Sequence, residues 1–429
     1  MANKLRAVPA AALVAEVLGE DLPIRVETWD GGTAGPEDAP ATLIVRSPDA
    51  LRRIVANRGE LGFARAYVAG DLDIDGDIYA VLGLRDRLPD VRLRPSHLLD
   101  AARIVGLRGL RPLPPPPEEA RLKGKRHSPA RDAAAVSHHY DVGNEFYRRV
   151  LGPSLTYSCA VFEAEDSTLE QAQAAKHELV CRKLGLQRDD RLLDVGCGWG
   201  SMAMHAARHH GARVVGVTIS ERQVELAKQR VADEGLGDLV DIRLQDYRDV
   251  DDGPFDAISS IGMFEHVGRS RTAEYFGRLR QLLRPQGRLL NHAISRAPSA
   301  HTALSDRSFI GRYVFPDGEL LDVGTTTQAL EQVGFETRHV ENLREHYALT
   351  LRRWVANLER EWDGAVVDVG LARARVWRLY MAGSAMNFEA DRNRIHQVLA
   401  VNTDEVGRSA MPARPNWERR PLSSESLAR

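Results

Sequence analysis

The chain has 429 residues, which is long enough for two domains with sizeable cores. Its 58 basic and 60 acidic residues give a formal net charge of -2, so no overall positive field attracts nucleic acid and we expect no nucleic-acid partner. The cysteines Cys159, Cys181 and Cys197 show neither a disulfide framework nor metal-ligand spacing, which predicts a reducing cytoplasm and no metal site. No stretch approaches the roughly 18 apolar residues of a membrane span, and Pro9 and Glu16 interrupt the apolar N-terminal stretch, which argues against a signal peptide. We therefore expect any membrane contact to be peripheral.

Residues 1–95 are predicted to form a small α/β accessory domain. Residues 22–29 alternate in the manner of a strand and stop at a Gly-containing turn, and residues 41–45 are typical of a partner strand. Ser47 as N-cap and Pro48 at the first helical position then predict a helix.

Residues 96–135 are predicted to be a helix followed by a proline-rich basic linker. The run Pro114-Pro115-Pro116-Pro117 forms a stiff spacer, and residues 101–135 contain eight Lys/Arg against three Asp/Glu. This segment is typical of a solvated linker, and it also fits a hinge with a basic patch for anionic lipid head groups.

The most informative stretch is a glycine-rich turn after a short apolar run. Residues 192–195 are typical of a strand, and Asp194-Val195-Gly196-Cys197-Gly198-Trp199-Gly200 leads into a predicted helix. Glycines let the backbone approach a ligand closely, and ligands collect at the carboxyl ends of strands in open α/β sheets. The order of glycines is not G-x-G-x-x-G, and the next strand ends in Thr218 rather than in an acid for a ribose. The pattern Asp-x-Gly-x-Gly favours an S-adenosylmethionine (SAM) methyltransferase over a dinucleotide enzyme.

Predicted strands and helices alternate from residue 136 onward. This alternation predicts an α/β fold with a mostly parallel sheet, that is, a Rossmann-like SAM methyltransferase domain over residues 136–400, preceded by the smaller α/β accessory domain. Residues 401–429 are rich in Arg, Pro and Ser and are predicted to be a mobile tail.

Six motifs in order resemble the cyclopropane-fatty-acyl-phospholipid synthase family, which includes the mycolic acid cyclopropane synthases. The resemblance covers residues 136–395, and the long N-terminal extension is more similar to the members that act on phospholipids. The motifs are His139-Tyr140-Asp141, Tyr157-Ser158-Cys159, the glycine turn, Gly216-Val217-Thr218-Ile219-Ser220 with Gln223, Gly262-Met263-Phe264-Glu265-His266-Val267-Gly268, and His292-Ala293-Ile294.

The resemblance implies methylation of a carbon–carbon double bond. A cis double bond in a phospholipid acyl chain would attack the methyl group of SAM, leaving a carbocation that loses a proton to give a cyclopropane or a methylene-branched chain. An alkene is a poor nucleophile, so the site must position it and exclude water. The alternative is a SAM-dependent C-methyltransferase of a soluble small molecule, and a third alternative is a SAM-binding or lipid-binding partner without turnover.

The resemblance also implies that a bicarbonate ion serves as the base. Glu265 and His292 would orient it through their side chains, Cys159 and Ile294 through backbone N–H groups, and Tyr347 through its hydroxyl. Tyr140 would present a ring face to the cation. Taken singly, these residues equally fit a small buried thiol, a helix N-terminal acid or a core histidine.

For SAM, the resemblance implies contacts in four places. Tyr157 and Ser158 would lie near the methionine part, and Asp194, Gly196 and Gly198 would form the turn. Further along, Thr218 and Gln223 would lie by the ribose and Gln245 and Asp246 near the adenine. Because Thr218 replaces the acid that many methyltransferases carry, we expect a weaker or rearranged ribose contact.

Glu145 stands where the family usually carries Asp. The longer carboxylate suggests either a protein base or a group that repositions the bicarbonate, and in both cases we expect a bias towards a methylene-branched product. A first-turn helix acid favoured by the helix dipole is an equal alternative.

The resemblance also sets expectations for partners and location. We expect an unsaturated phospholipid acyl chain at the membrane surface as substrate, with the protein in the cytoplasm and peripherally associated with the inner face of the membrane. An accessory domain on a hinge is compatible with a homodimer, and a methylene product would be a substrate for a downstream reductase.

Overall fold

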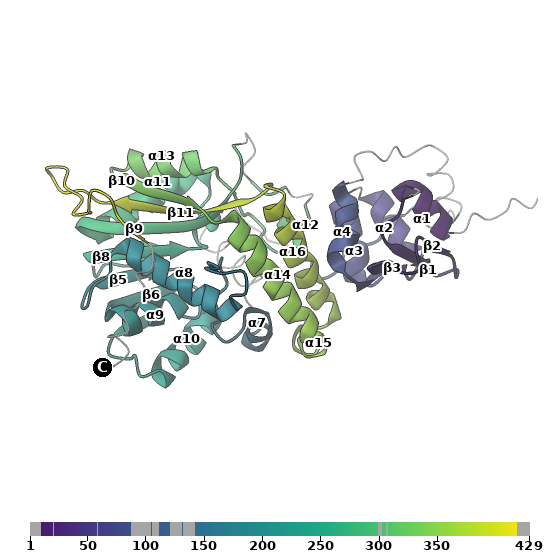
Figure 1. Ribbon diagram of the computed structural model, residues 1–429, viewed down its shortest axis with the longest axis horizontal. Helices are drawn as coiled ribbons and strands as arrows, with labels where there is room; N and C mark the ends of the chain where they lie inside the picture. The colour runs from purple at the N-terminus through teal and green to yellow at the C-terminus, as the bar shows by residue number, and fades with distance from the viewer. Residues whose placement is uncertain are drawn as a thin grey trace, which may run out of the picture. The chain divides into compact units, whose positions relative to one another are not determined.

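The computed structural model describes residues 10–19, 21–57, 59–86, 104, 111–120, 131, 142–298, 303–305 and 308–417. The chain divides into two compact units, which are described separately (Figure 1). Unit 1 comprises Met1–Val150, Leu304–Gly318 and Leu351–Ala390, and unit 2 comprises Leu151–Ala303, Glu319–Thr350 and Asp391–Arg429.

Unit 1 contains a four-stranded mixed sheet in the order β2-β1-β3-β4. Buried and half-buried residues alternate along β3, as its sequence predicts for a strand with one face on a core. The strands are β1 (Arg25–Thr28), β2 (Thr33–Ala34), β3 (Ala41–Val45) and β4 (Leu72–Gly76). The helices are α1 (Ala10–Leu18), α2 (Asp49–Ala56), α3 (Glu60–Ala69), α4 (Ile78–Leu82), η1 (Gly83–Asp86), α7 (Asn144–Leu151), α12 (Phe309–Tyr313), α15 (Trp362–Val369) and α16 (Leu371–Glu389).

Unit 2 contains a seven-stranded sheet in the order β10-β11-β9-β8-β5-β6-β7. β11 runs antiparallel to β9 and β10, and the other described neighbours pair in parallel. The mostly parallel α/β sheet predicted from the sequence is therefore confirmed. The strands are β5 (Arg191–Val195), β6 (Arg213–Thr218), β7 (Val240–Leu244), β8 (Phe255–Ile261), β9 (Leu283–Ser295), β10 (Glu336–Asn342) and β11 (Arg394–Val401).

Helices cover both faces of this sheet. Leu192, Val214 and Leu290 pack with one set of helices and their chain neighbours Leu193, Val215 and Leu289 with the other, as strand alternation requires. The first face carries α8 (Leu169–Leu184), α9 (Ser201–His210) and α10 (Glu221–Asp233), and the second carries α11 (Thr272–Leu282) and α13 (Val323–Gln332) (Figure 1). Unit 2 also contains η4 (Tyr247–Asp249), η5 (Phe264–His266), η6 (Arg269–Arg271) and the part of α14 (Arg344–Arg360) up to Thr350.

The helix that precedes the glycine turn has a sequence signal for a helix start at one end and for a helix stop at the other. Thr168 and Gln171 form a reciprocal capping box at the start of α8, and Gly185 ends the helix in the left-handed conformation. Ser220 likewise caps α10 by accepting the backbone N–H of Gln223.

The contacts divide the chain differently from the predicted ranges. Residues 351–390 were expected within a catalytic domain of 136–400, yet they group with the N-terminal residues. The reason is a set of long-range polar contacts, because Arg375 of α16 pairs with Asp73 at 2.9 Å and Arg378 donates to the carbonyl oxygens of Ile74 and Gly76 at 3.2 and 3.1 Å. The assignment of an accessory role to residues 1–95 and of a catalytic role to residues 136–400 stays a prediction.

Two predicted segments are described only in part. Most of the predicted linker 96–135 lies outside the described residues, as does the predicted tail after Trp417. Before that point the tail is bonded to unit 2, since Arg182 donates to the carbonyl oxygen of Trp417 at 2.6 Å and Asn402 donates to that of Leu283 at 3.2 Å. None of the described helices combines the length and the apolar character needed to cross a membrane.

Candidate functional site

The glycine turn follows β5, the strand at which the strand order of the sheet reverses. β5 has β6 on one side and β8 on the other, so its carboxyl end opens a crevice of the kind that binds ligands in α/β proteins. Gly196 and Gly198 have φ of 74° and 55°, values that favour glycine. The backbone N–H groups of Gly196 and Cys197 both donate to the carbonyl oxygen of Val217, which fixes the turn against β6. A Cβ built at Gly198 meets nothing within 4 Å, so the space beside the turn is open to a ligand.

Asp194, next to the last residue of β5, is a buried carboxyl group, and one of its oxygens has no described hydrogen-bond partner. Its Oδ1 accepts the hydroxyl of Ser259 at 2.7 Å, and its Oδ2 has no hydrogen-bond partner within the described part of the chain. Burial raises the pKa of Asp194 to about 6, although the Ser259 hydrogen bond and the charge of Lys176 oppose the rise. A buried polar atom without a partner is costly in a folded protein, and such atoms often face a ligand.

Ser158 is held by two side chains of α8. Gln173 donates to the Ser158 carbonyl oxygen at 2.8 Å, and the Lys176 ammonium donates to the Ser158 hydroxyl at 3.1 Å. Lys176 is fully buried, and burial lowers its pKa to about 7 although Asp194 opposes the fall. Lys176 was not predicted as a site residue, and the signal that could have found it is a charged residue on the buried face of α8.

The structure brings the predicted ribose residues together. The Thr218 hydroxyl donates to Gln223 Oε1 at 2.8 Å, and both side chains are buried at the end of β6 and the start of α10. Because the amide oxygen of Gln223 is engaged, its NH₂ group is the part left to recognise a ligand.

The predicted adenine residues follow β7 and have partners within the chain. Gln245 donates to the carbonyl oxygen of Asp249 at 2.9 Å, and Asp246 accepts the backbone N–H of Arg248 at 2.9 Å. Burial acts to raise the pKa of Asp246, but its hydrogen bonds to Arg248 outweigh burial and lower it overall. Contact of these residues with adenine stays a prediction.

Glu265 and Ile294 are joined by a hydrogen bond across the ends of two strands. Glu265 lies on η5 just after β8, and its Oε1 accepts the backbone N–H of Ile294 on β9 at 2.7 Å. Its Oε2 is shielded from solvent and has no partner among the described residues, although part of the residue is exposed. Burial raises the pKa of Glu265 to about 7, against the effect of the Ile294 hydrogen bond.

His292 is a neutral, oriented donor beside this pair. It lies opposite Ile261 in the β8–β9 register, and burial lowers its pKa well below the usual value. Lys183 donates to Gln397 Oε1 at 2.7 Å, so the amide NH₂ of Gln397 faces His292 Nδ1 at 3.4 Å. Nδ1 therefore accepts and Nε2 carries the proton. Nε2 is buried and has no described partner.

Lys183 and Gln397 were not predicted as site residues. Lys183 offered one sequence signal, because it follows Lys176 by seven residues on the same helix face. Gln397 offered none, because only the pairing of β11 with β9 places it opposite His292.

Cys159 lies against the start of α14, which carries Tyr347. Its thiol is within 3.7 Å of the carbonyl oxygen of Leu343, and the next backbone N–H, that of Ala160, donates to the Thr350 hydroxyl at 3.1 Å. Leu343 in turn donates to the carbonyl oxygen of Ile395, which lies opposite Ile294 in the β11–β9 register. Burial raises the pKa of the Cys159 thiol, so the thiol is protonated and not a nucleophile.

Unit 1 carries Glu145, and Tyr140 lies outside the described residues. Glu145 is in the first turn of α7, its side chain is 67% exposed, and it pairs with Arg148 at 2.9 Å. These contacts suit a first-turn helix acid, and its role as a base stays a prediction.

We predict that Glu265→Gln removes a pH-dependent loss of stability. Between about pH 4.5 and 7 the unfolded carboxyl ionises while the folded one stays protonated, so the contribution of Glu265 to stability falls as pH rises through this range. Above pH 8 the variant should be more stable than the parent by about 3 kcal/mol, and near pH 4 the two should be equal.

Chemical denaturation across pH 4–9 measures this difference. Glu225→Gln, an exposed acid on α10, controls for loss of one carboxylate. A constant difference between Glu265→Gln and the parent at all pH values would contradict the assignment.

Comparison with known proteins gives one consistent family. The family model described as mycolic acid cyclopropane synthetase matches residues 127–398. A "Probable fatty acid methyltransferase" of Mycobacterium tuberculosis is 47% identical over 407 residues, which are 92% of this chain and 95% of that protein. The cyclopropane-fatty-acyl-phospholipid synthase of Escherichia coli K12 is 35% identical over 377 residues, 88% of this chain and 92% of that protein.

A solved structure agrees with these sequence relatives. The mycolic acid cyclopropane synthase CmaA1, crystallised with SAH and CTAB, matches with a TM-score of 0.59 and 33% identity over 63% of this chain and 98% of that one. The resemblance inferred from the six motifs is therefore confirmed. The chain belongs to the mycolic acid cyclopropane synthetase family, and it is a SAM-dependent methyltransferase of the cyclopropane synthase and fatty acid methyltransferase type.

Proposed function

We propose that this protein transfers the methyl group of SAM to a cis double bond in the acyl chain of an unsaturated phospholipid. The observation that carries the proposal is a pair of buried polar atoms without described partners. They are Glu265 Oε2, on the short helix that follows β8, and His292 Nε2, on the adjoining strand β9. β8 also pairs in parallel with β5, so its carboxyl end lies at the same edge of the sheet as the glycine turn. The names of the relatives support a fatty acyl substrate, since they include a fatty acid methyltransferase and a phospholipid synthase.

The residues present fit SAM. Its methionine part would lie by Tyr157 and Ser158, and its ribose by Thr218 and Gln223. Because a Cβ at Gly198 would meet nothing within 4 Å, a ligand can approach the backbone of the turn there. SAM, when bound, supplies an electrophilic methyl group on a positively charged sulfur.

The proposed reaction adds one CH₂ unit. The π electrons of the alkene form a new C–C bond as the methyl C–S bond breaks, and the sulfur keeps that electron pair. A carbocation remains on the other alkene carbon. Loss of a proton from the transferred carbon then closes a cyclopropane, or leaves a methylene branch if a hydride first shifts between the two carbons.

The buried groups also fit a small anion such as bicarbonate. His292 presents Nε2–H as a donor, and Glu265, with its pKa raised to about 7, is largely protonated below that pH and can share its proton with an anion. The Ile294 N–H is already donated to Glu265, so the anion would share this donor with the carboxyl group. Bicarbonate, when bound, would supply the base that accepts the proton from the substrate, with Cys159 and Tyr347 completing the set.

We further propose that the protein meets its substrate at a membrane surface as a peripheral protein. A phospholipid acyl chain remains in the bilayer, so the enzyme must reach it there. Homodimer formation and a reductase acting on a methylene product belong to the same proposal.

We predict that the purified protein, given SAM and vesicles of cis-monounsaturated phospholipid, adds one CH₂ unit to the fatty acids. Mass spectrometry of the released fatty acids measures the gain, and hydrogenation separates a reducible methylene from a ring. His292→Asn should lower the rate by about 10²-fold or more, because it removes the oriented donor beside the reacting groups. His339→Asn on β10 is the matched control.

Calorimetric SAM binding by the His292 variant distinguishes lost chemistry from lost folding. If the vesicle lipids gain no mass while SAM binds, and a soluble acceptor is methylated instead, the lipid substrate is wrong.

Bicarbonate should be required for full rate. In buffer stripped of carbon dioxide we expect activity to fall several-fold and to return when bicarbonate is added, because the proposed anion is the group that would accept the substrate proton. The control is SAM binding, which should not depend on bicarbonate. Equal rates in both buffers would contradict a role for bicarbonate and would mean that a protein group accepts the proton from the substrate.

Gln397 is predicted to act as a positioning residue. Gln397→Glu keeps the size and the bond to Lys183 but replaces the NH₂ that faces His292 Nδ1 with an acceptor. The imidazole should then carry its proton on Nδ1, and kcat should fall by about 10–100-fold with little change in the KM for SAM. Nitrogen NMR of His292 reads the tautomer directly, and an unchanged tautomer with an unchanged kcat would refute this role.

A further inference from the structure

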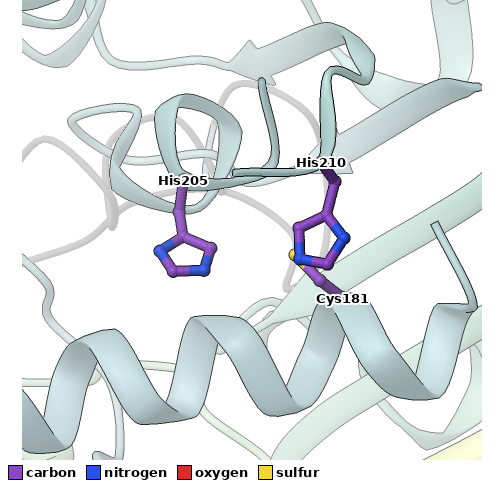
Figure 2. A group of neighbouring side chains, drawn as sticks. All are labelled: Cys181, His205 and His210. Carbon is purple, nitrogen blue, oxygen red and sulfur yellow. The ribbon is translucent and has the colours of Figure 1, made fainter. Parts of the chain in front are cut away.

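We propose that Cys181, His205 and His210, together with Glu178, bind a divalent transition-metal ion of the zinc class. The ligand atoms of Cys181, His205 and His210 all lie within 4.8 Å of one another. Figure 2 shows the cysteine rising from one helix toward two imidazoles that descend from another. The site lies within unit 2 and is separate from the residues of the methyltransferase site.

Glu178, which contacts both histidines, is the candidate fourth ligand. Glu178 Oε2 lies 3.3 Å from His205 Nε2 and 3.0 Å from His210 Nε2. In tetrahedral zinc sites the ligand atoms are about 3.3–3.8 Å apart, given bonds of about 2.0–2.3 Å. The two distances from Glu178 to the histidines are close to this spacing, and the proposal requires Cys181 to approach the same point.

The packing of two helices creates this cluster. Glu178 and Cys181 are three residues apart and share a face of α8, while His205 lies within α9 and His210 is its last residue. Each pair alone is unremarkable in sequence, which is why cysteine spacing predicted no metal site.

The hydrogen bonds of Glu178 do not account for the whole cluster. They join the Glu178 carboxylate to His205 and His210, and Arg182 Nε pairs with the other oxygen of this carboxylate at 3.2 Å. The Cys181 thiol is fully buried beside them, and no hydrogen bond from it is described. A thiol and two imidazoles are borderline-soft ligands, which favour zinc, cobalt or nickel over magnesium or calcium.

The position of the cluster indicates a structural role. α9 starts at the glycine turn and runs back along the sheet, so His210 lies near the start of β6, at the edge opposite the carboxyl ends. A metal there would join α8 to α9 without touching the reacting groups. α8 also carries Gln173 and Lys176, so the metal would stabilise the helix that holds Ser158.

Cobalt binding tests the site in the full-length protein after treatment with a chelator. We expect one Co²⁺ per chain, with a thiolate-to-cobalt charge-transfer band, and one Zn²⁺ that displaces it and raises the thermal unfolding midpoint. Cys181→Ser should abolish the band, and His205→Ala should weaken binding at least tenfold. His339→Ala is the control and should bind as the parent does.

The outcomes separate a metal site from a hydrogen-bonded cluster. If stoichiometric binding and the band persist in Cys181→Ser, the metal binds elsewhere and the proposal is wrong. If the folded parent binds neither ion, the proposal is also wrong, and the cluster is a set of hydrogen bonds centred on Glu178. Circular dichroism of each variant confirms folding, and His205→Ala provides the test if Cys181→Ser does not fold.

Discussion

The hydrogen bond from the Ile294 N–H to Glu265 holds the centre of the candidate site together. It joins the short helix after β8 to β9, and the parallel register of these strands brings His292 opposite Ile261 beside it. The bond uses one carboxyl oxygen and leaves the other buried without a described partner. The cost of that burial raises the pKa of Glu265 and leaves the site ready to accept a further polar group. An unpaired buried oxygen therefore lies where the methyl transfer is proposed to take place, and a bound polar ligand would satisfy it.

Much of the fold of unit 2 follows from local sequence signals. The capping box at Thr168, the Ser220 cap and the glycine turn each specify an element boundary through contacts with near neighbours in the chain. Alternating strands and helices then leave few topologies other than a mostly parallel sheet. The division into units was less predictable, because it depends on α16 meeting β4 through Arg375 and Arg378, a contact across about three hundred residues.

The residues of the candidate site also fall into two groups, those that the sequence indicates and those that only long-range contacts reveal. Glu265, His292 and Ile294 were expected in the site because they stand in motifs that carry the family resemblance, and Thr218 and Gln223 were expected for the same reason. Gln397 and Lys183 act through His292 from a distant strand and a preceding helix, so only the three-dimensional pairing reveals them. The histidine and cysteine cluster between α8 and α9 is a similar case, since its members are unremarkable until the helices pack.

The fate of the transferred methyl hydrogens tests the central claim most directly. With SAM that carries three deuterium atoms on its methyl group, the proposed cation chemistry predicts a fatty acid that gains one carbon with two deuteriums, because one is lost as the ring or methylene forms. A product that keeps all three would show that no proton leaves the transferred carbon. The buried groups of Glu265 and His292 would then have to serve a different reaction.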